Sequence, residues 1–175
     1  MNLIFDLETD GLLDNFTCIH CLCIHDLDNA ETYTFNEQGT KESIVRGVEM
    51  LEDADSIIGH NIIHFDIPII RRIYPWFSND HAIDTLLLSR LYHPNILSID
   101  KNRAWKMMPQ QLYGRHSLEA YGHRLGTYKG EFGKQTDWKN WSPEMEAYME
   151  QDVVVTTKLW MHFQPFLNGS KWNIR

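Results

Sequence analysis

The feature that most constrains the fold is a short apolar stretch at the start of the chain that carries two acids. Residues 2–8 read Asn-Leu-Ile-Phe-Asp-Leu-Glu, and a turn-forming Thr-Asp-Gly follows them. A run this short and apolar is typical of a buried strand, whose side chains alternate between two faces. Asp6 and Glu8 therefore share one face, about 6.6 Å apart along the strand. Because buried carboxylates need compensation, the pattern predicts either a bound cation or a strand end that faces water.

The overall charge narrows the range of partners. The chain has 175 residues and a formal net charge of −8, and 43% of its residues are hydrophobic. This length and composition predict one globular domain over residues 1–175. A protein that holds nucleic acid by its own charge is usually basic. An acidic chain suggests instead that any contacts with nucleic acid are short, that metal ions bridge the phosphates, or that a partner protein supplies the affinity for nucleic acid.

The sequence shows no sign of export or of disulfide bonding. No apolar run approaches about eighteen residues, and the N-terminus lacks a basic-then-apolar signal pattern, so we expect a cytoplasmic protein. Cys18, Cys21 and Cys23 are an odd number crowded into one stretch, which is not a disulfide framework. Buried reduced thiols are the favoured interpretation, with a zinc site that includes His20 or His25 as the alternative.

The first half of the chain alternates between strand and helix patterns. Residues 16–26 and 31–35 are predicted to continue an antiparallel meander from the first strand, with a turn at Asp28-Asn29. Apolar residues at helical spacing predict a helix over residues 41–51, and a short buried strand follows at residues 56–59. The order strand, helix, strand implies a parallel pairing and hence a mixed α/β sheet.

The second half is predicted to be mostly helical. Helices are expected from about Pro68, over residues 86–92 with Asp84 as the cap, over residues 117–126, and from Pro143 to about Phe163. Residues 95–114 lack a period and mix basic with aromatic side chains. We expect an irregular segment there that serves as a surface for a nucleic-acid strand, a lid or a partner contact.

Two further acids lie where an ionised side chain needs an explanation. Asp66 stands at a helix start, where capping is the common role. Asp152 falls within the apolar stripe of the last helix, four residues after Tyr148 and on the same face. A buried helical Asp is uncommon unless it is paired or coordinated. With Asp6 and Glu8, these acids form a set of four carboxylates that suits two Mg²⁺ or Mn²⁺ ions and phosphodiester cleavage.

The order and spacing of these residues resemble the 3′–5′ exonuclease family whose signature is Asp-x-Glu, then Asn-x₂₋₃-Phe/Tyr-Asp, then Tyr-x₃-Asp. The three motifs stand here as residues 6–8, 61–66 and 148–152. A sister group carries His five residues before the last Asp, and Ala147 holds that position here. The chain is therefore similar to the tyrosine-containing DEDDy group of the RNase H-like superfamily.

The likeness extends to the proofreading domain of family-A replicative DNA polymerases from podovirus-type phages. It runs through residues 83–91 and 116–132 and covers nearly the whole chain. It implies an RNase H-like mixed sheet, an antiparallel meander plus parallel strands, flanked by helices. Those polymerases continue for several hundred residues beyond this domain. Both an excised domain and a free-standing exonuclease with a separately encoded DNA polymerase as partner are therefore open.

The resemblance also implies a role for each residue of the site. Asp6 would bridge two divalent ions, Glu8 and Asp152 would complete the first, and Asp66 would hold the second through water. Tyr148 would orient the attacking water.

Substrate contacts follow from the same resemblance. Leu12 and Phe65 would touch the terminal bases and Thr9 the terminal sugar, and Asn61 of the second motif is assigned to substrate binding as well. The expected reaction is release of nucleoside 5′-monophosphates from the 3′ end of single-stranded DNA during phage replication or repair. Cleavage of RNA by the same site and a non-catalytic docking domain for a replication protein are the alternatives.

Overall fold

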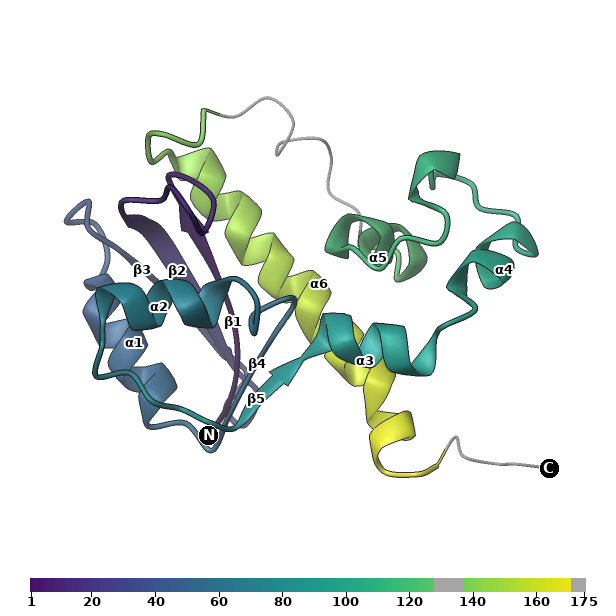
Figure 1. Cartoon of the computed structure of the whole chain (residues 1–175), viewed down its shortest axis with the longest axis horizontal. Coiled ribbons are helices and arrows are strands. Elements are labelled where there is room, and N and C mark those ends of the chain that lie inside the picture. The colour runs from purple at the N-terminus through teal and green to yellow at the C-terminus, as the bar shows by residue number, and fades with distance from the viewer. Residues whose placement is uncertain (128–136, 171–175) are drawn as a thin grey trace.

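The computed structural model describes residues 1–127 and 137–170 and contains a five-stranded mixed sheet with helices on both faces (Figure 1). The strands are β1 (Asn2–Thr9), β2 (Ile19–Asp26), β3 (Glu31–Asn36), β4 (Ser56–Gly59) and β5 (Ala82–Asp84). The helices are α1 (Ile44–Glu52), α2 (Asp66–Ile73), α3 (Thr85–Tyr92), α4 (Ile96–Lys101), α5 (Leu118–Arg124) and α6 (Pro143–Leu167), with a short 3₁₀ turn η1 (Gln110–Leu112). The order β3-β2-β1-β4-β5 confirms the predicted meander joined to parallel strands.

The central strand β1 presents its two faces to different layers. It pairs antiparallel with β2 and parallel with β4. Its apolar residues at odd positions pack with α1 and α2, whereas Ile4 packs with Met145 and Met149 of α6. Because side chains alternate along a strand, Asp6 and Glu8 belong to the face of Ile4. The acids predicted to hold metal therefore lie beneath α6.

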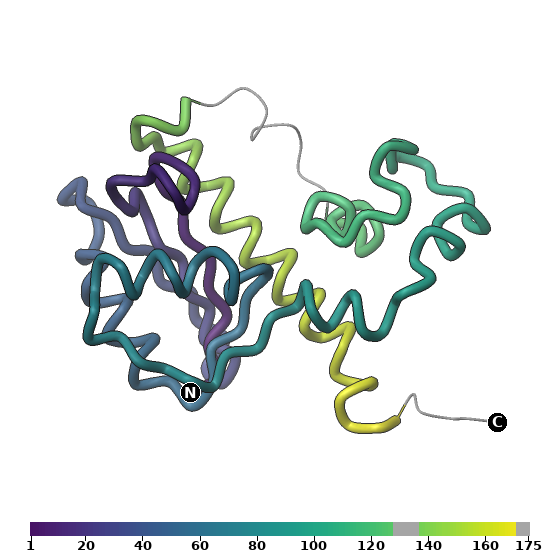
Figure 2. Tube along the Cα trace, in the orientation of Figure 1, coloured from purple at the N-terminus to yellow at the C-terminus, as the bar shows by residue number. Residues whose placement is uncertain are grey.

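Helix α6 lies between the sheet and the helices α3, α4 and α5 (Figure 1). Figures 1 and 2 show α6 running obliquely between the sheet and a helical segment formed by α3, α4 and α5. On the sheet side α6 buries Met145, Met149 and Val153. On its other side Leu159 and Phe163 pack with residues of the helical segment. Each such side chain stabilises the fold by roughly 1.5–3 kcal/mol, so both halves of the molecule are fixed on one helix.

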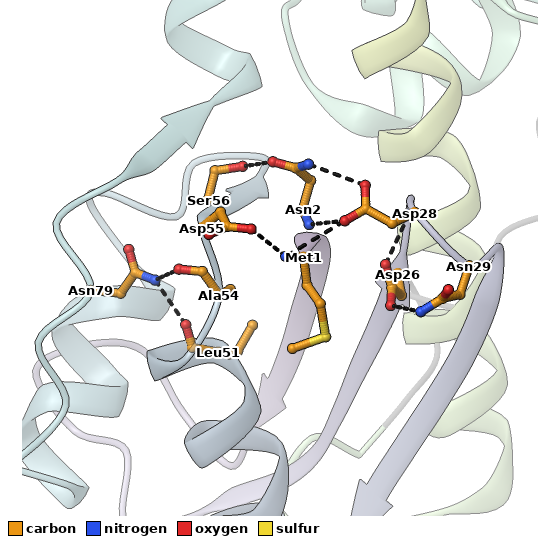
Figure 3. Close-up of polar contacts among 10 residues, drawn as sticks. All are labelled: Met1, Asn2, Asp26, Asp28, Asn29, Leu51, Ala54, Asp55, Ser56 and Asn79. Atoms are coloured by element: carbon orange, nitrogen blue, oxygen red, sulfur yellow. Dashed lines mark hydrogen bonds and ion pairs between the residues drawn. The ribbon is translucent and has the colours of Figure 1, made fainter.

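A polar network fastens the sheet at the end of β1 remote from the two acids (Figure 3). The Asn2 amide donates to Asp28 at 3.2 Å, and the Ser56 hydroxyl donates to Asn2 at 2.8 Å. Asp26 holds the β2–β3 turn by accepting from the Asp28 backbone at 2.9 Å. The Asn79 side-chain amide donates to the carbonyl of Leu51, in the last turn of α1, and to that of Ala54 just after the helix. The acids at this end of β1 therefore stabilise the sheet by accepting hydrogen bonds.

The starts of two elements differ from the prediction for identifiable reasons. The second strand begins at Ile19 and not at residue 16, because Asp10 accepts hydrogen bonds from the Thr17 and Cys18 backbones and holds that stretch as a loop. The first helix begins at Ile44, because Glu42 still bridges to β3. Residues 10–18 therefore form a loop at the end of β1 where Glu8 lies.

The expectation for residues 95–114 was wrong in part, because α4 and η1 lie within this range. Their only buried residues are Ile96, Asp100 and Leu112, which is too few to produce a visible helical period. The last helix ends four residues beyond the predicted Phe163.

The prediction of buried thiols is confirmed for two of the three cysteines. Cys21 and Cys23 are buried as expected, but Cys18 is exposed. Residues 128–132 of the motif-like stretch 116–132 lie outside the described residues. In the described part of the chain, no helix is both long enough and apolar enough to cross a membrane.

Candidate active site

Three acids from two distant parts of the chain converge at the middle of the sheet. One carboxylate oxygen from each of Asp6, Glu8 and Asp152 lies within 4.8 Å of the others, and all three side chains are half-buried. It is the single group of three or more potential metal ligands among residues 1–127 and 137–170. Asp6 and Glu8 are brought together by the alternation of β1, and Asp152 reaches them because α6 crosses that face. The structure thus assembles three of the four acids predicted as ligands.

Tyr148 lies beside these acids with its proton retained. Burial, and then the neighbouring carboxylates with Asp152 foremost, raises the pKa of Tyr148 well above its usual value, and the phenol hydrogen-bonds to Asp152. The ring meets Trp138 edge-on, with centroids 6.1 Å apart. A phenol held in this way is a hydrogen-bond donor at neutral pH. It is thus suited to orienting an oxygen atom beside the acids.

Asp66 is positioned by the start of α2 and by a hydrogen bond with the backbone of β1. It is the first residue of α2 and is only 3% exposed, while Phe65 holds the capping position, so the capping interpretation is wrong. Its carboxyl accepts a hydrogen bond from the Leu7 backbone, and burial raises its pKa to about 7. Asp66 does not belong to the group of three acids. Its role as a ligand of a second ion stays a prediction.

Asp84 has a wider role than the capping predicted for it. Its carboxylate accepts from the Leu86 backbone at the start of α3 at 2.9 Å, which confirms the cap. It also accepts from the backbones of Asn61 at 2.8 Å and Ile63 at 3.2 Å. These bonds fix the loop after β4 in which Asn61 adopts a positive φ of 67°. Because Asp66 directly follows this loop, Asp84 indirectly positions it.

A pocket of about 290 Å³ opens beside the acids, and three of the predicted substrate residues line it. Its lining residues are Glu8, Thr9, Gly11, Leu12, Phe65 and Trp138. Leu12 is 72% exposed at the edge of this pocket. The Thr9 hydroxyl donates to the Gly11 carbonyl at 2.6 Å and so also shapes the turn. The volume is near the lower limit for a small-molecule site and is suited to one terminal nucleotide.

The sequence patterns missed Trp138, and the assignment of Asn61 to substrate binding stays a prediction. The carbonyl of Trp138 is 3.0 Å from Nε2 of His20, which ties this residue to β2 beside the pocket. Its position depends on tertiary contacts, so no local pattern pointed to it. Asn61 lines a different hollow together with residues of α3 and α5 and does not line the pocket beside the acids.

The acids and the pocket together define the chemistry that is possible here. Three carboxylates offer hard oxygen ligands of the kind that Mg²⁺ and Mn²⁺ prefer, and the donor set therefore fits such ions. Without cations, the same carboxylates would repel a phosphate group. Divalent ions bound to the three carboxylates would remove this repulsion.

Sequence comparisons place the chain among known proteins. The RNase_H superfamily model matches residues 3–164. The DNA-directed DNA polymerase of Escherichia phage T7 is 31% identical over 181 aligned residues, and that of Enterobacteria phage T3 is 32% identical over 182. Each alignment covers 90% of this chain and 26% of the polymerase, so the chain spans about a quarter of the length of these curated relatives.

Solved structures share the fold at lower identity. A nuclease in its apo form has a TM-score of 0.65 at 18% identity, with coverage of 97% of this chain and 75% of its own. Brucella melitensis NrnC with bound Mg²⁺ has a TM-score of 0.61 at 16% identity, covering 97% and 76%. Exonuclease I of E. coli in complex with a dT13 oligonucleotide has a TM-score of 0.60 at 17% identity, covering 97% and 42%.

These findings agree with the motifs and with the order of the strands. The family model covers most of the chain, the phage polymerases align along its length, and the solved structures repeat its sheet. The chain therefore belongs to the RNase H superfamily and is related to the DNA polymerases of phages T7 and T3.

Proposed function

We propose that the chain is a metal-dependent 3′–5′ exonuclease that removes nucleoside 5′-monophosphates from the 3′ end of single-stranded DNA. The observation that carries the proposal is the convergence of Asp6, Glu8 and Asp152 within 4.8 Å beside a nucleotide-sized pocket. The aligned relatives are DNA polymerases, and one structural neighbour holds a DNA oligonucleotide. We further propose that the domain acts in proofreading or repair of DNA, in the cytoplasm and together with a phage DNA polymerase.

The four acids of the site would bind the divalent cations. Asp6, Glu8 and Asp152 would hold one Mg²⁺ or Mn²⁺ ion, and Asp6 and Asp66 would hold a second. Bound ions supply a water of lowered pKa and offset the charge that develops on the leaving 3′ oxygen. Burial raises the pKa of the Asp66 carboxyl to about 7, and a nearby cation would favour its ionised form.

The remaining residues of the site position the substrate and the water. The Tyr148 hydroxyl, which keeps its proton, would orient the attacking water toward the scissile phosphorus. Leu12, Phe65 and Trp138 give the pocket apolar walls against which the terminal base can stack. Thr9 lies at the pocket's turn and would contact the terminal sugar.

A nuclease assay with neutral isosteres of the acids tests the proposal. Asp6→Asn combined with Glu8→Gln should abolish release of the labelled nucleotide from a 3′-labelled DNA oligonucleotide in Mg²⁺ or Mn²⁺, and EDTA should do the same to the wild type. The matched control is Asp14→Asn, an exposed acid of the same N-terminal region that lies outside the site. Unchanged digestion by the double variant, with the fold verified by circular dichroism, would refute the assignment.

Tyr148→Phe separates orientation of the water from metal binding. The change removes only the hydroxyl, so kcat should fall roughly 10²-fold while the Mn²⁺ affinity stays within about twofold of the wild type. Titration of Mn²⁺ by calorimetry and single-turnover hydrolysis measure the two quantities. A variant that hydrolyses DNA at the wild-type rate would exclude this role.

The same assay distinguishes the alternative substrates and roles. DNA and RNA oligonucleotides of equal sequence are compared at equal concentration. Equal or faster cleavage of RNA would indicate that RNA, and not DNA, is the substrate. A wild-type protein that cleaves neither, yet binds a DNA polymerase, would instead be the docking domain.

A further inference from the structure

Two histidines from different helices meet near the C-terminal ends of α3 and α6. Nε2 of His93, the residue that follows α3, lies 2.7 Å from Nε2 of His162 on α6. The two rings are tilted by 44°, with centroids 5.1 Å apart. Because an α-helix rises about 1.5 Å per residue, His162 lies about 15 Å beyond Asp152 along α6. The contact is therefore separate from the acidic group.

The contact between the two Nε2 atoms depends on where each ring carries its proton. A neutral imidazole has one N–H and one lone pair, so one ring donates through Nε2 while the other accepts there. Two Nε2–H groups would face each other as donors and would open the contact. At least one lone pair is therefore directed at the partner ring. This is also the direction in which an imidazole nitrogen binds a metal ion.

The geometry is close to that of two imidazoles on one metal ion. With nitrogen–metal bonds of about 2.0–2.1 Å, two ligands at a tetrahedral angle have their nitrogens roughly 3.3 Å apart. The observed separation of 2.7 Å is somewhat shorter, and small changes of side-chain torsion can supply the difference. Both histidines are half-buried, so their rings are partly open to solvent. Imidazole suits Zn²⁺, Ni²⁺ and Cu²⁺, whereas Mg²⁺ prefers oxygen ligands.

The surroundings of the contact favour a positive charge. His93 is the C-cap of α3, and His162 lies in the last two turns of α6, so the partially negative ends of both helices lie beside the contact. The ring centroids of Phe163 and Phe166 lie 5.1–5.7 Å from those of the two histidines. Aromatic rings at this distance attract cations through their faces. Helix ends and aromatic rings thus both favour a cation here.

Two protein ligands would leave positions for water on a bound ion. Among residues 1–127 and 137–170, no third His, Cys, Asp or Glu joins this pair to form a group of three potential ligands. The basic residues one turn before each histidine, Arg90 and Lys158, are exposed. Because water and salt screen exposed charges, their repulsion of a cation at the contact is weak.

We propose that His93 and His162 bind a divalent transition-metal ion of the Zn²⁺, Ni²⁺ or Cu²⁺ class through their Nε2 atoms, with water at the remaining positions. The proton on the donating Nε2 moves, through water, to Nδ1 of the same ring. Both rings then stay neutral, and each directs a lone pair to the ion. The ion joins α3 to α6 and so stabilises the packing of the helical segment on α6. This site does not depend on the proposed nuclease activity.

Calorimetric titration with Ni²⁺ tests the site in the whole chain without an affinity tag. Every protein carries Asp6→Asn and Glu8→Gln, which weaken the acidic group as a competing site. This background protein should bind one Ni²⁺. His93→Gln and His162→Gln should each weaken the binding at least about tenfold, since each removes one of two imidazole ligands. Mg²⁺ should not compete with Ni²⁺, because it prefers oxygen ligands.

Two further measurements report the ligands and the effect on the fold. The electron paramagnetic resonance spectrum of the Cu²⁺ complex should show coupling to two ring nitrogens in the background protein and to one in either variant. Saturating Ni²⁺ should raise the thermal midpoint of the background protein by about 5 °C and leave that of both variants unchanged, because a ligand of the folded state adds to stability. Since His93 and His162 lie on different elements, one folded variant is enough to decide.

The matched control is His81→Gln, because His81 is exposed and lies just before β5, outside the contact. Its loss should change the Ni²⁺ affinity less than twofold. Equal weakening by the control, or an affinity that neither variant changes, would overturn the inference. A background protein that binds neither Ni²⁺ nor Zn²⁺ would also overturn it and would leave a hydrogen-bonded pair only. Hydrolysis of DNA by the wild type is scored separately and tests only the proposed function.

Discussion

Replacing Asp66 by Asn should make the metal-free protein more stable in a pH-dependent way. Asp66 is 3% exposed, and burial raises the pKa of its carboxyl from 3.8 to about 7. Between these values the folded protein retains a proton that the unfolded chain has lost. The free energy of unfolding of the wild type therefore falls as pH rises through this window. Asn has no such proton, and its Oδ1 can still accept from the Leu7 backbone.

The size of the effect follows from the shift. Each pH unit within the window is worth 1.36 kcal/mol, so the penalty is absent below about pH 4, reaches about 1.5 kcal/mol at pH 5 and levels off near 4 kcal/mol above pH 7. Asp66→Asn should be more stable than the wild type by these amounts. With a urea m-value of about 2 kcal/mol/M, its midpoint at pH 8 should be about 2 M higher.

Urea unfolding followed by circular dichroism at pH 5 and pH 8, with EDTA present, measures the difference. Asp14→Asn serves as the control, because this exposed acid should give the same small change at both pH values. Adding Mg²⁺ at pH 8 should stabilise the wild type and reduce the advantage of the variant, since a ligand of the folded state adds to stability. A variant no more stable than the wild type at pH 8, or a gain independent of pH, would refute the reasoning.

Three further predictions concern packing, a buried ion pair and the pocket. Gly59→Ala should cost roughly 2 kcal/mol of stability, because the new methyl would lie 2.2 Å from Ile62 Cγ2 and 2.9 Å from the Phe5 carbonyl; a urea midpoint equal to that of the wild type would contradict this. Arg124→Met should cost about 3–5 kcal/mol by isolating the buried carboxylate of Asp100, and Asp100→Asn in the same chain should recover part of the loss in thermal unfolding. Trp138→Ala should raise the KM for oligonucleotides severalfold with kcat nearly unchanged, and an unchanged KM would remove Trp138 from the substrate pocket.

The acidic group could be predicted from sequence because short-range periodicity determines it. Alternation along β1 places Asp6 and Glu8 on one face whatever the rest of the chain does. Helical spacing likewise places Asp152 one turn after Tyr148. The packing of α6 over β1 was the one step that periodicity did not determine. The apolar side of α6 nevertheless indicated it, because Met145 and Met149 of α6 pack against the sheet.

The remaining parts of the site depend on contacts that no local pattern records. Trp138 reaches the pocket through a hydrogen bond between its carbonyl and His20, which is 118 residues away in sequence. The interpretation of residues 95–114 as a surface for a nucleic-acid strand, a lid or a partner stays a prediction. The contacts around Asp100 that organise its turns could not be seen in the sequence.

The position of Asp66 shows how the sheet itself creates the site. β4 pairs with β1 only from Asn2 to Ile4, and the chain then turns away through the loop held by Asp84. The second half of β1 therefore lacks a strand partner on that edge, and the Asp66 carboxyl accepts the hydrogen bond of Leu7 there. A longer β4 would satisfy the backbone but would leave no place for this carboxyl. The early end of the parallel pairing is thus what brings a fourth acid to the strand that carries Asp6 and Glu8.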